Sequence, residues 1–67
     1  MDVLKKIGRN VRRLREAKGL SQEQLAFEAD MHRTYVSGIE RGVRNPTATV
    51  LQRLAIALSC SVGELFK

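Results

Sequence analysis

Apolar residues recur at every third or fourth position through most of the chain, which is the period of an amphipathic α-helix. Over residues 2–18 this spacing gives one apolar stripe, formed by Leu4, Ile7, Val11 and Leu14. Residues 48–58 carry another, formed by Leu51, Leu54, Ala55 and Leu58. No segment alternates apolar and polar residues with a period of two, so the pattern predicts an all-α chain.

Capping residues predict where the middle helices begin and end. Ser21 and Gln24 have the spacing of a capping box, which starts a short second helix that ends near residue 29. The next three residues are too few for anything but a turn. A third helix is expected over residues 33–41, because Gly42 stands where a left-handed C-terminal glycine belongs. Two helices joined by such a turn have helix-turn-helix geometry.

The remaining helices have signals of the same kind. Gly19 ends the first helix, and Thr47 is placed to cap the fourth. Ser61 and Glu64 have the spacing of a second capping box, so a short fifth helix is expected at the end of the chain. The 67 residues allow one domain, residues 1–67, with an aliphatic core.

Charge and cysteine content narrow the function classes. The net charge of +5 indicates a polyanionic partner, either nucleic acid or an anionic lipid surface. One cysteine and one histidine exclude an intrachain disulfide and a structural zinc site. No apolar run approaches the roughly 20 residues that span a bilayer, and no signal-type segment follows the basic N-terminus. We therefore expect a cytoplasmic protein with no membrane partner.

Several motifs in order resemble one family. Residues 19–26 (Gly-Leu-Ser-Gln-Glu-Gln-Leu-Ala) resemble the opening of the helix-turn-helix in lambda-repressor-like (Xre-type) regulators. Residues 33–42 resemble their recognition helix, and residues 44–47 resemble the loop that follows it. The resemblance covers nearly the whole chain and implies a compact five-helix DNA-binding domain. In length and basic balance the chain also resembles the small restriction-modification controller proteins of that family.

The chain departs from the family pattern at three positions. Asp30 and Ser59 stand where glycine is usual, and His32 stands at a cap position where Ser, Thr or Asp is expected. Aspartate tolerates a positive φ better than most residues. We expect these departures to affect local stability and not the fold.

The resemblance implies that the start of the third helix reads bases in the major groove. The base-reading positions are Arg33, Thr34 and Ser37. Arginine can donate two hydrogen bonds to guanine O6 and N7, and threonine can bond to a base or pack on a thymine methyl group. The alternative is a solvated polar face. Gly38 either allows a close approach of DNA or is neutral at an exposed site.

Phosphate contacts are assigned to residues around this helix, namely Gln22, Tyr35, Arg41, Arg44 and Asn45. Gln22 opens the second helix, whose N–H groups suit a phosphate, and by resemblance its side chain braces the recognition helix. Arg44 could instead enter a minor groove. For the flanking residues, solvated charges or a half-buried ring remain alternatives.

The acidic residues of the middle segment need positions that keep their charges away from the DNA. By resemblance, Arg15 and Glu40 form a structural ion pair that ties the first helix to the third; the alternative is two exposed charges. Three other acids should lie away from the DNA groove, namely Glu23, Glu28 and Asp30.

A homodimer contact is expected near the C-terminus, since the basic surfaces are needed for DNA. Ile56 falls off the inward face of the fourth helix, and Val62 and Phe66 lie nearby, so these three form the predicted interface. The alternative is that Phe66 folds back onto its own core.

The sequence predicts a DNA-binding regulator of transcription that acts as a homodimer on a palindromic operator. The alternative is an antitoxin-type protein-interaction module that also binds DNA. A membrane-surface peptide is disfavoured because the core needs the apolar stripe of the first helix. No nucleophile–base set is present, so an enzyme is not expected, nor is a metal, cofactor or small-molecule ligand.

Overall fold

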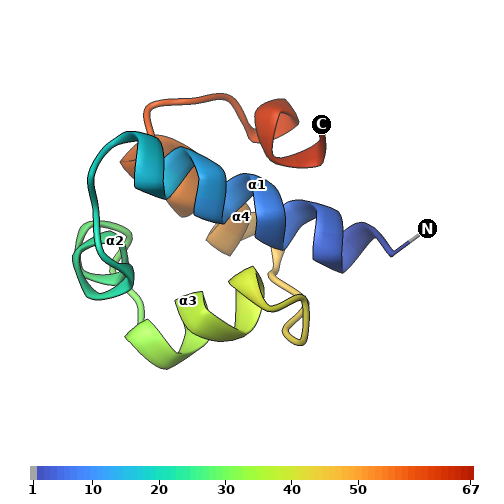
Figure 1. Ribbon diagram of the computed structural model, residues 1–67, viewed down its shortest axis with the longest axis horizontal. Helices are drawn as coiled ribbons and strands as arrows, with labels where there is room; N and C mark the ends of the chain where they lie inside the picture. Colours follow the sequence, from blue (N-terminus) through green and yellow to red (C-terminus); the bar gives the residue numbers. More distant parts are fainter. Residues whose placement is uncertain (1) are drawn as a thin grey trace.

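The computed structural model describes residues 2–67 and is all-helical over that range (Figure 1). Its elements are α1 (Val3–Ala17), α2 (Gln22–Glu28), α3 (Arg33–Glu40), α4 (Ala48–Ala57) and the 3₁₀-helix η1 (Val62–Phe66). No strand occurs in the described part of the chain, so the all-α prediction is confirmed. The five-helix count is corrected, because the last element is a 3₁₀-helix and not a fifth α-helix.

The end of the chain lacks the predicted capping box. The Ser61 side chain makes no capping bond, and the Glu64 carboxylate accepts a hydrogen bond from Lys67 Nζ at 2.9 Å instead. The Glu64 N–H donates to the Ser61 carbonyl at 3.1 Å, which is the i→i+3 bond of a 3₁₀ turn. Nucleating an α-helix costs free energy, and the five residues of η1 form too few hydrogen bonds to offset that cost.

The other predicted helix starts are present. Ser21 Oγ accepts from the Gln24 N–H at 3.0 Å, and Gln24 Oε1 accepts from the Ser21 N–H at 2.8 Å, which completes the capping box of α2. Thr47 Oγ1 accepts from the Val50 N–H at 3.2 Å. His32 makes no side-chain capping bond, in agreement with its unfavourable residue type.

Two non-glycine residues adopt the left-handed conformation after a helix. Asp30 has φ of 56° and Ser59 has φ of 57°, at the two positions where glycine is usual in the family. The Met31 N–H donates to the Ala26 carbonyl at 2.9 Å, and the Cys60 N–H donates to the Ala55 carbonyl at 2.9 Å. Each left-handed residue therefore reverses the chain and satisfies a helix-end carbonyl.

Helix α1 crosses the molecule in front of α4, and it packs against both α3 and η1 (Figure 1). The fully buried large side chains come from every helix, and they are Val11, Leu25, Val36, Ile39, Leu54 and Leu65. Asn10 is a buried polar residue on α1, and its Nδ2 donates to the Leu65 carbonyl at 3.0 Å. This bond attaches the C-terminal segment to α1.

The contact between α1 and α3 depends on a glycine. A Cβ atom on Gly8 would lie 2.4 Å from the Ile39 carbonyl oxygen and 2.6 Å from the Glu40 carbonyl oxygen. Both neighbours are backbone atoms of α3, so no side-chain rotation could make room. Gly8 therefore sets how closely the two helices approach.

We expect Gly8→Ala to lower the free energy of unfolding by about 2 kcal/mol, since overpacking against the backbone outweighs the gain in helix propensity. Chemical denaturation followed by circular dichroism measures this change. Gly63→Ala is the matched control, because its Cβ would meet only Ser61 Oγ at 3.8 Å. Equal stability of the two variants would show that the close approach of α1 and α3 does not require glycine at position 8.

Candidate nucleic-acid interface

The turn between α2 and α3 sets one face of α3 toward the core and leaves the other exposed. Val36 and Ile39 are buried, and Met31 in the turn packs against the same core. Arg33 and Thr34 are exposed and Ser37 is half-buried. The predicted base-reading side chains therefore share the outer side of α3, with the N-terminus of α2 beside them.

A hollow of about 560 Å³ lies between the N-terminal parts of α2 and α3. Its lining includes all three predicted base-reading residues and Gln22, and the full set is Arg15, Ser21, Gln22, Glu23, Arg33, Thr34 and Ser37. The expectation that Glu23 lies away from this surface is wrong. Its Oε2 lies 3.7 Å from Arg33 Nη1, so the two exposed side chains form an ion pair.

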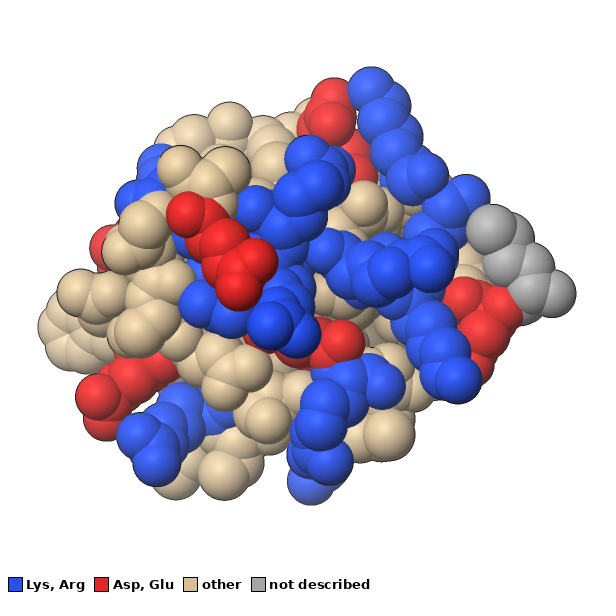
Figure 2. Space-filling view, in the orientation of Figure 1, with Lys and Arg blue, Asp and Glu red and all other residues tan. Residues whose placement is uncertain are grey.

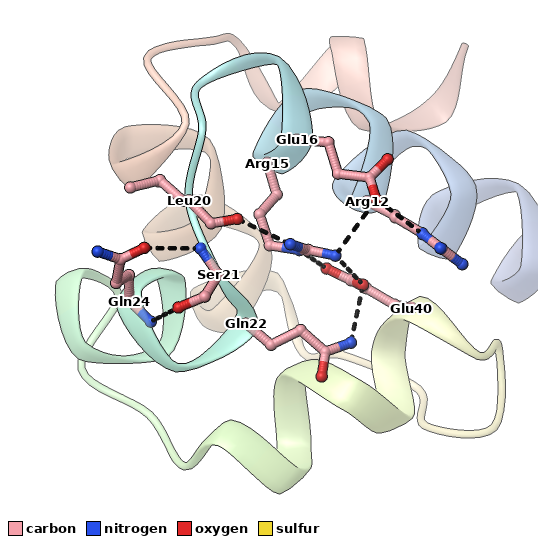
Figure 3. Close-up of polar contacts among 8 residues, drawn as sticks. All are labelled: Arg12, Arg15, Glu16, Leu20, Ser21, Gln22, Gln24 and Glu40. Atoms are coloured by element: carbon pink, nitrogen blue, oxygen red, sulfur yellow. Dashed lines mark hydrogen bonds and ion pairs between the residues drawn. The ribbon is translucent and has the colours of Figure 1, made fainter.

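A polar network that includes two residues of the hollow, Arg15 and Gln22, lies between α1, α2 and α3 (Figure 3). Arg15 Nε donates to Glu40 Oε2 at 2.7 Å, and Arg15 Nη2 donates to Glu40 Oε1 at 3.2 Å. The side chain of Arg15 is 11% exposed and that of Glu40 is 4% exposed. The structure thus places these two charges in a bidentate, largely buried pair, and the alternative of two exposed charges is wrong.

Two further bonds bring α2 into this network. Gln22 Nε2 donates to Glu40 Oε1 at 3.0 Å, and Arg15 Nη1 donates to the Leu20 carbonyl at 2.7 Å. Among the described residues, no buried side-chain nitrogen or oxygen lacks a hydrogen-bond partner. The hydrogen bond to Glu40 raises the pKa of Arg15, against the opposing effect of burial. The start of α2 is therefore fixed against both α1 and α3.

Arg44 occupies the space beside Gly38. A Cβ on Gly38 would lie 2.4 Å from Arg44 Cγ, and Gly38 is buried. The Arg44 guanidinium carbon lies 5.9 Å from the centre of the Tyr35 ring, within range of a cation–π contact. The interpretation of Gly38 as a neutral, exposed site is therefore wrong, since Gly38 is buried and Arg44 of this chain packs over it.

Basic side chains gather on the face that carries α1, with acidic side chains between them (Figure 2). The predicted flanking residues Arg41, Arg44 and Asn45 are exposed, and Tyr35 is half-buried. Those residues continue the exposed side of α3 into the following loop. The positive charge is therefore not confined to the predicted base-reading residues.

The predicted dimer residues are all exposed at the C-terminal end. Ile56 is 73% exposed, Phe66 is 42% exposed and Val62 is 37% exposed. Phe66 therefore does not fold back into its own core. Sequence reasoning missed Phe27 on α2, which is 85% exposed and lies outside the apolar stripes.

The other candidate features within residues 2–67 are metal ligands, membrane spans and the single cysteine. No group of three or more His, Cys, Asp and Glu side chains in that range could hold a metal ion. None of the helices described there is long and apolar enough to cross a membrane. Cys60 packs partly buried against the core, and this burial raises its pKa.

Comparisons with known proteins agree on one family. Residues 11–65 match the family described as helix-turn-helix. Control protein C.BamHI of Bacillus amyloliquefaciens is 46% identical over 59 residues, covering 87% of this chain and 73% of that protein. Control protein C.SmaI of Serratia marcescens is 46% identical over 65 residues, covering 97% of this chain and 77% of that protein.

Similarity extends to solved structures. The crystal structure of the restriction-modification controller protein C.AhdI from Aeromonas hydrophila superimposes with a TM-score of 0.92 at 51% identity. The match covers 94% of this chain and 96% of that chain. The correspondence therefore includes nearly all of both chains.

Removing the Glu40 carboxylate should destabilise the fold, because the Arg15 charge would stay buried without its partner. We expect Glu40→Ala to cost about 3 kcal/mol or more. Glu16→Ala is the control, since this 55% exposed carboxylate lies 3.9 Å from Arg15 Nη2 and should change stability by under about 1 kcal/mol. A double-mutant cycle of Arg15 and Glu40 measures their coupling. A coupling of zero would contradict a structural role.

Proposed function

The chain belongs to the Xre-type helix-turn-helix family, as the sequence resemblance implied, and on this premise we propose that it is a sequence-specific, double-stranded-DNA-binding regulator of transcription. The family comprises non-enzymatic regulators, and the proposed activity is binding with no reaction step. In this proposal the protein acts in the cytoplasm.

One observation carries this proposal. Arg33, Thr34 and Ser37 line one hollow beside α2, while the opposite face of α3 is buried against the core. A helix held in this way can enter the major groove, where each base pair presents a distinct set of donors and acceptors. Arg33 is suited to guanine O6 and N7, and the two hydroxyl groups can donate or accept at neighbouring base edges.

Residues around the recognition helix contact phosphates in this proposal. Tyr35, Arg41, Arg44 and Asn45 lie on α3 or just after it, and Gln22 opens α2 beside the same hollow. Such contacts position a protein on DNA without reading sequence, and they release counterions. Affinity for any duplex should therefore fall steeply as salt rises.

The protein acts as a homodimer on a palindromic operator in this proposal. A single recognition helix reads only a few base pairs, whereas a two-fold dimer reads two half-sites roughly 34 Å apart. Ile56, Val62 and Phe66 are exposed apolar residues, and none of them lines the hollow that we assign to DNA. An isologous contact through these three residues is consistent with two-fold symmetry.

Selection of bound duplexes from a random pool tests the function directly. The parent chain should enrich a palindromic motif. Arg33→Ala should lose about 1–3 kcal/mol of binding free energy on that motif and relax base choice at one position in each half-site. Arg44→Ala should weaken binding to all sequences and leave the motif unchanged. A parent chain that enriches no motif, or two variants that alter the motif equally, would contradict the proposed roles.

Analytical ultracentrifugation tests the dimer contact. Ile56→Glu and Phe66→Glu each place a charge in the proposed apolar contact, so both variants should sediment as monomers where the parent sediments as a dimer. Phe27→Glu is the matched control, because Phe27 is 85% exposed and lies on α2. Variants that remain dimeric place the interface elsewhere. A parent that is monomeric both free and on its selected duplex contradicts the homodimer.

A further inference from the structure

A carboxylate lies inside the surface that is proposed to meet DNA. Glu23 lines the same hollow as Arg33, Thr34 and Ser37, and its Oε2 is 3.7 Å from Arg33 Nη1. Its side chain is 76% exposed and that of Arg33 is 66% exposed. An acid at this place repels the phosphates of any duplex, so general affinity for DNA does not explain it.

The two kinds of partner available to Arg33 on DNA differ in charge. A guanidinium has five N–H donors, so one edge can stay paired with Glu23 while another donates to guanine O6 and N7. The guanine edge is neutral, and Glu23 does not oppose it. A phosphate on the same guanidinium would bring a second anion close to the carboxylate. Glu23 therefore penalises the phosphate contact more than the guanine contact.

We propose that Glu23 is a specificity-determining positioning residue, which directs the Arg33 guanidinium to a guanine edge and away from phosphates. This inference rests on the proposed function and adds a residue to it. The other exposed acids of the segment, Glu28 and Asp30, do not line the hollow. The effect should therefore be a property of Glu23 and not of the acidic segment as a whole.

Glu23 also lies in the first turn of α2, where a negative charge favours the helix. A residue that only stabilised α2 would change the melting temperature and would change binding to all duplexes by one common factor. The ratio of affinities for two duplexes separates the roles, because only a positioning role changes that ratio.

The experiment measures dissociation constants by fluorescence anisotropy for the selected duplex and for a scrambled duplex of equal length. Glu23→Gln should bind the scrambled duplex more tightly and the selected duplex about as before. We expect the specificity ratio to fall by about two- to fivefold, which is the range that an exposed ion pair supports. Glu28→Gln removes the same charge from the same helix, and it should leave the ratio unchanged.

A second pair of variants tests whether Arg33 transmits the effect. In an Arg33→Ala background, Glu23→Gln should no longer change the ratio. A ratio that is unchanged by Glu23→Gln, changed equally by Glu28→Gln, or still changed without Arg33 overturns the inference. A parent chain that binds both duplexes equally overturns the proposed function and the inference with it. A parent that discriminates between the duplexes, with a ratio that Glu23→Gln leaves undiminished, overturns the inference alone.

Discussion

The buried pair of Arg15 and Glu40 is the interaction on which the arrangement of the first three helices depends. The two oxygens of Glu40 accept from Arg15 and Gln22, and Arg15 also donates to the Leu20 carbonyl just before α2. Three helices thus meet at one carboxylate. Such a pair adds little net stability compared with apolar packing, but a misplaced partner would leave a charge buried alone. Its main effect is therefore to select one geometry.

That geometry supports the exposed face of α3 from two sides. Gly8 lets α1 approach the α3 backbone closely, and Arg44 packs over Gly38 at the side of the following loop. Side chains on a helix fixed in this way lose little freedom when they bind a partner, which favours precise contacts by the proposed base-reading residues. Each glycine makes room by lacking a side chain. Gly8 makes room for the backbone of α3, and Gly38 makes room for the Arg44 side chain.

A chain of 67 residues has a small core, and polar contacts between distant segments complete it. The Asn10 side chain holds the Leu65 carbonyl, so the last segment is joined to the first helix. The left-handed conformations of Asp30 and Ser59 carry a cost that glycine would avoid. Met31 follows Asp30 and Cys60 follows Ser59, and both pack against the core, which offsets that cost.

The sequence by itself determined the features that depend on near neighbours. Apolar periodicity predicted the helices, and the Ser21–Gln24 capping box marked the start of α2, because both involve residues three or four positions apart. Local spacing failed at Ser61 and Glu64, where Lys67 takes the carboxylate. Only the tertiary structure decided that Glu23 meets Arg33, that Arg44 fills the space at Gly38, and that Asn10 reaches Leu65. These contacts depend on the angles and distances at which separate helices pack, and no local pattern encodes them.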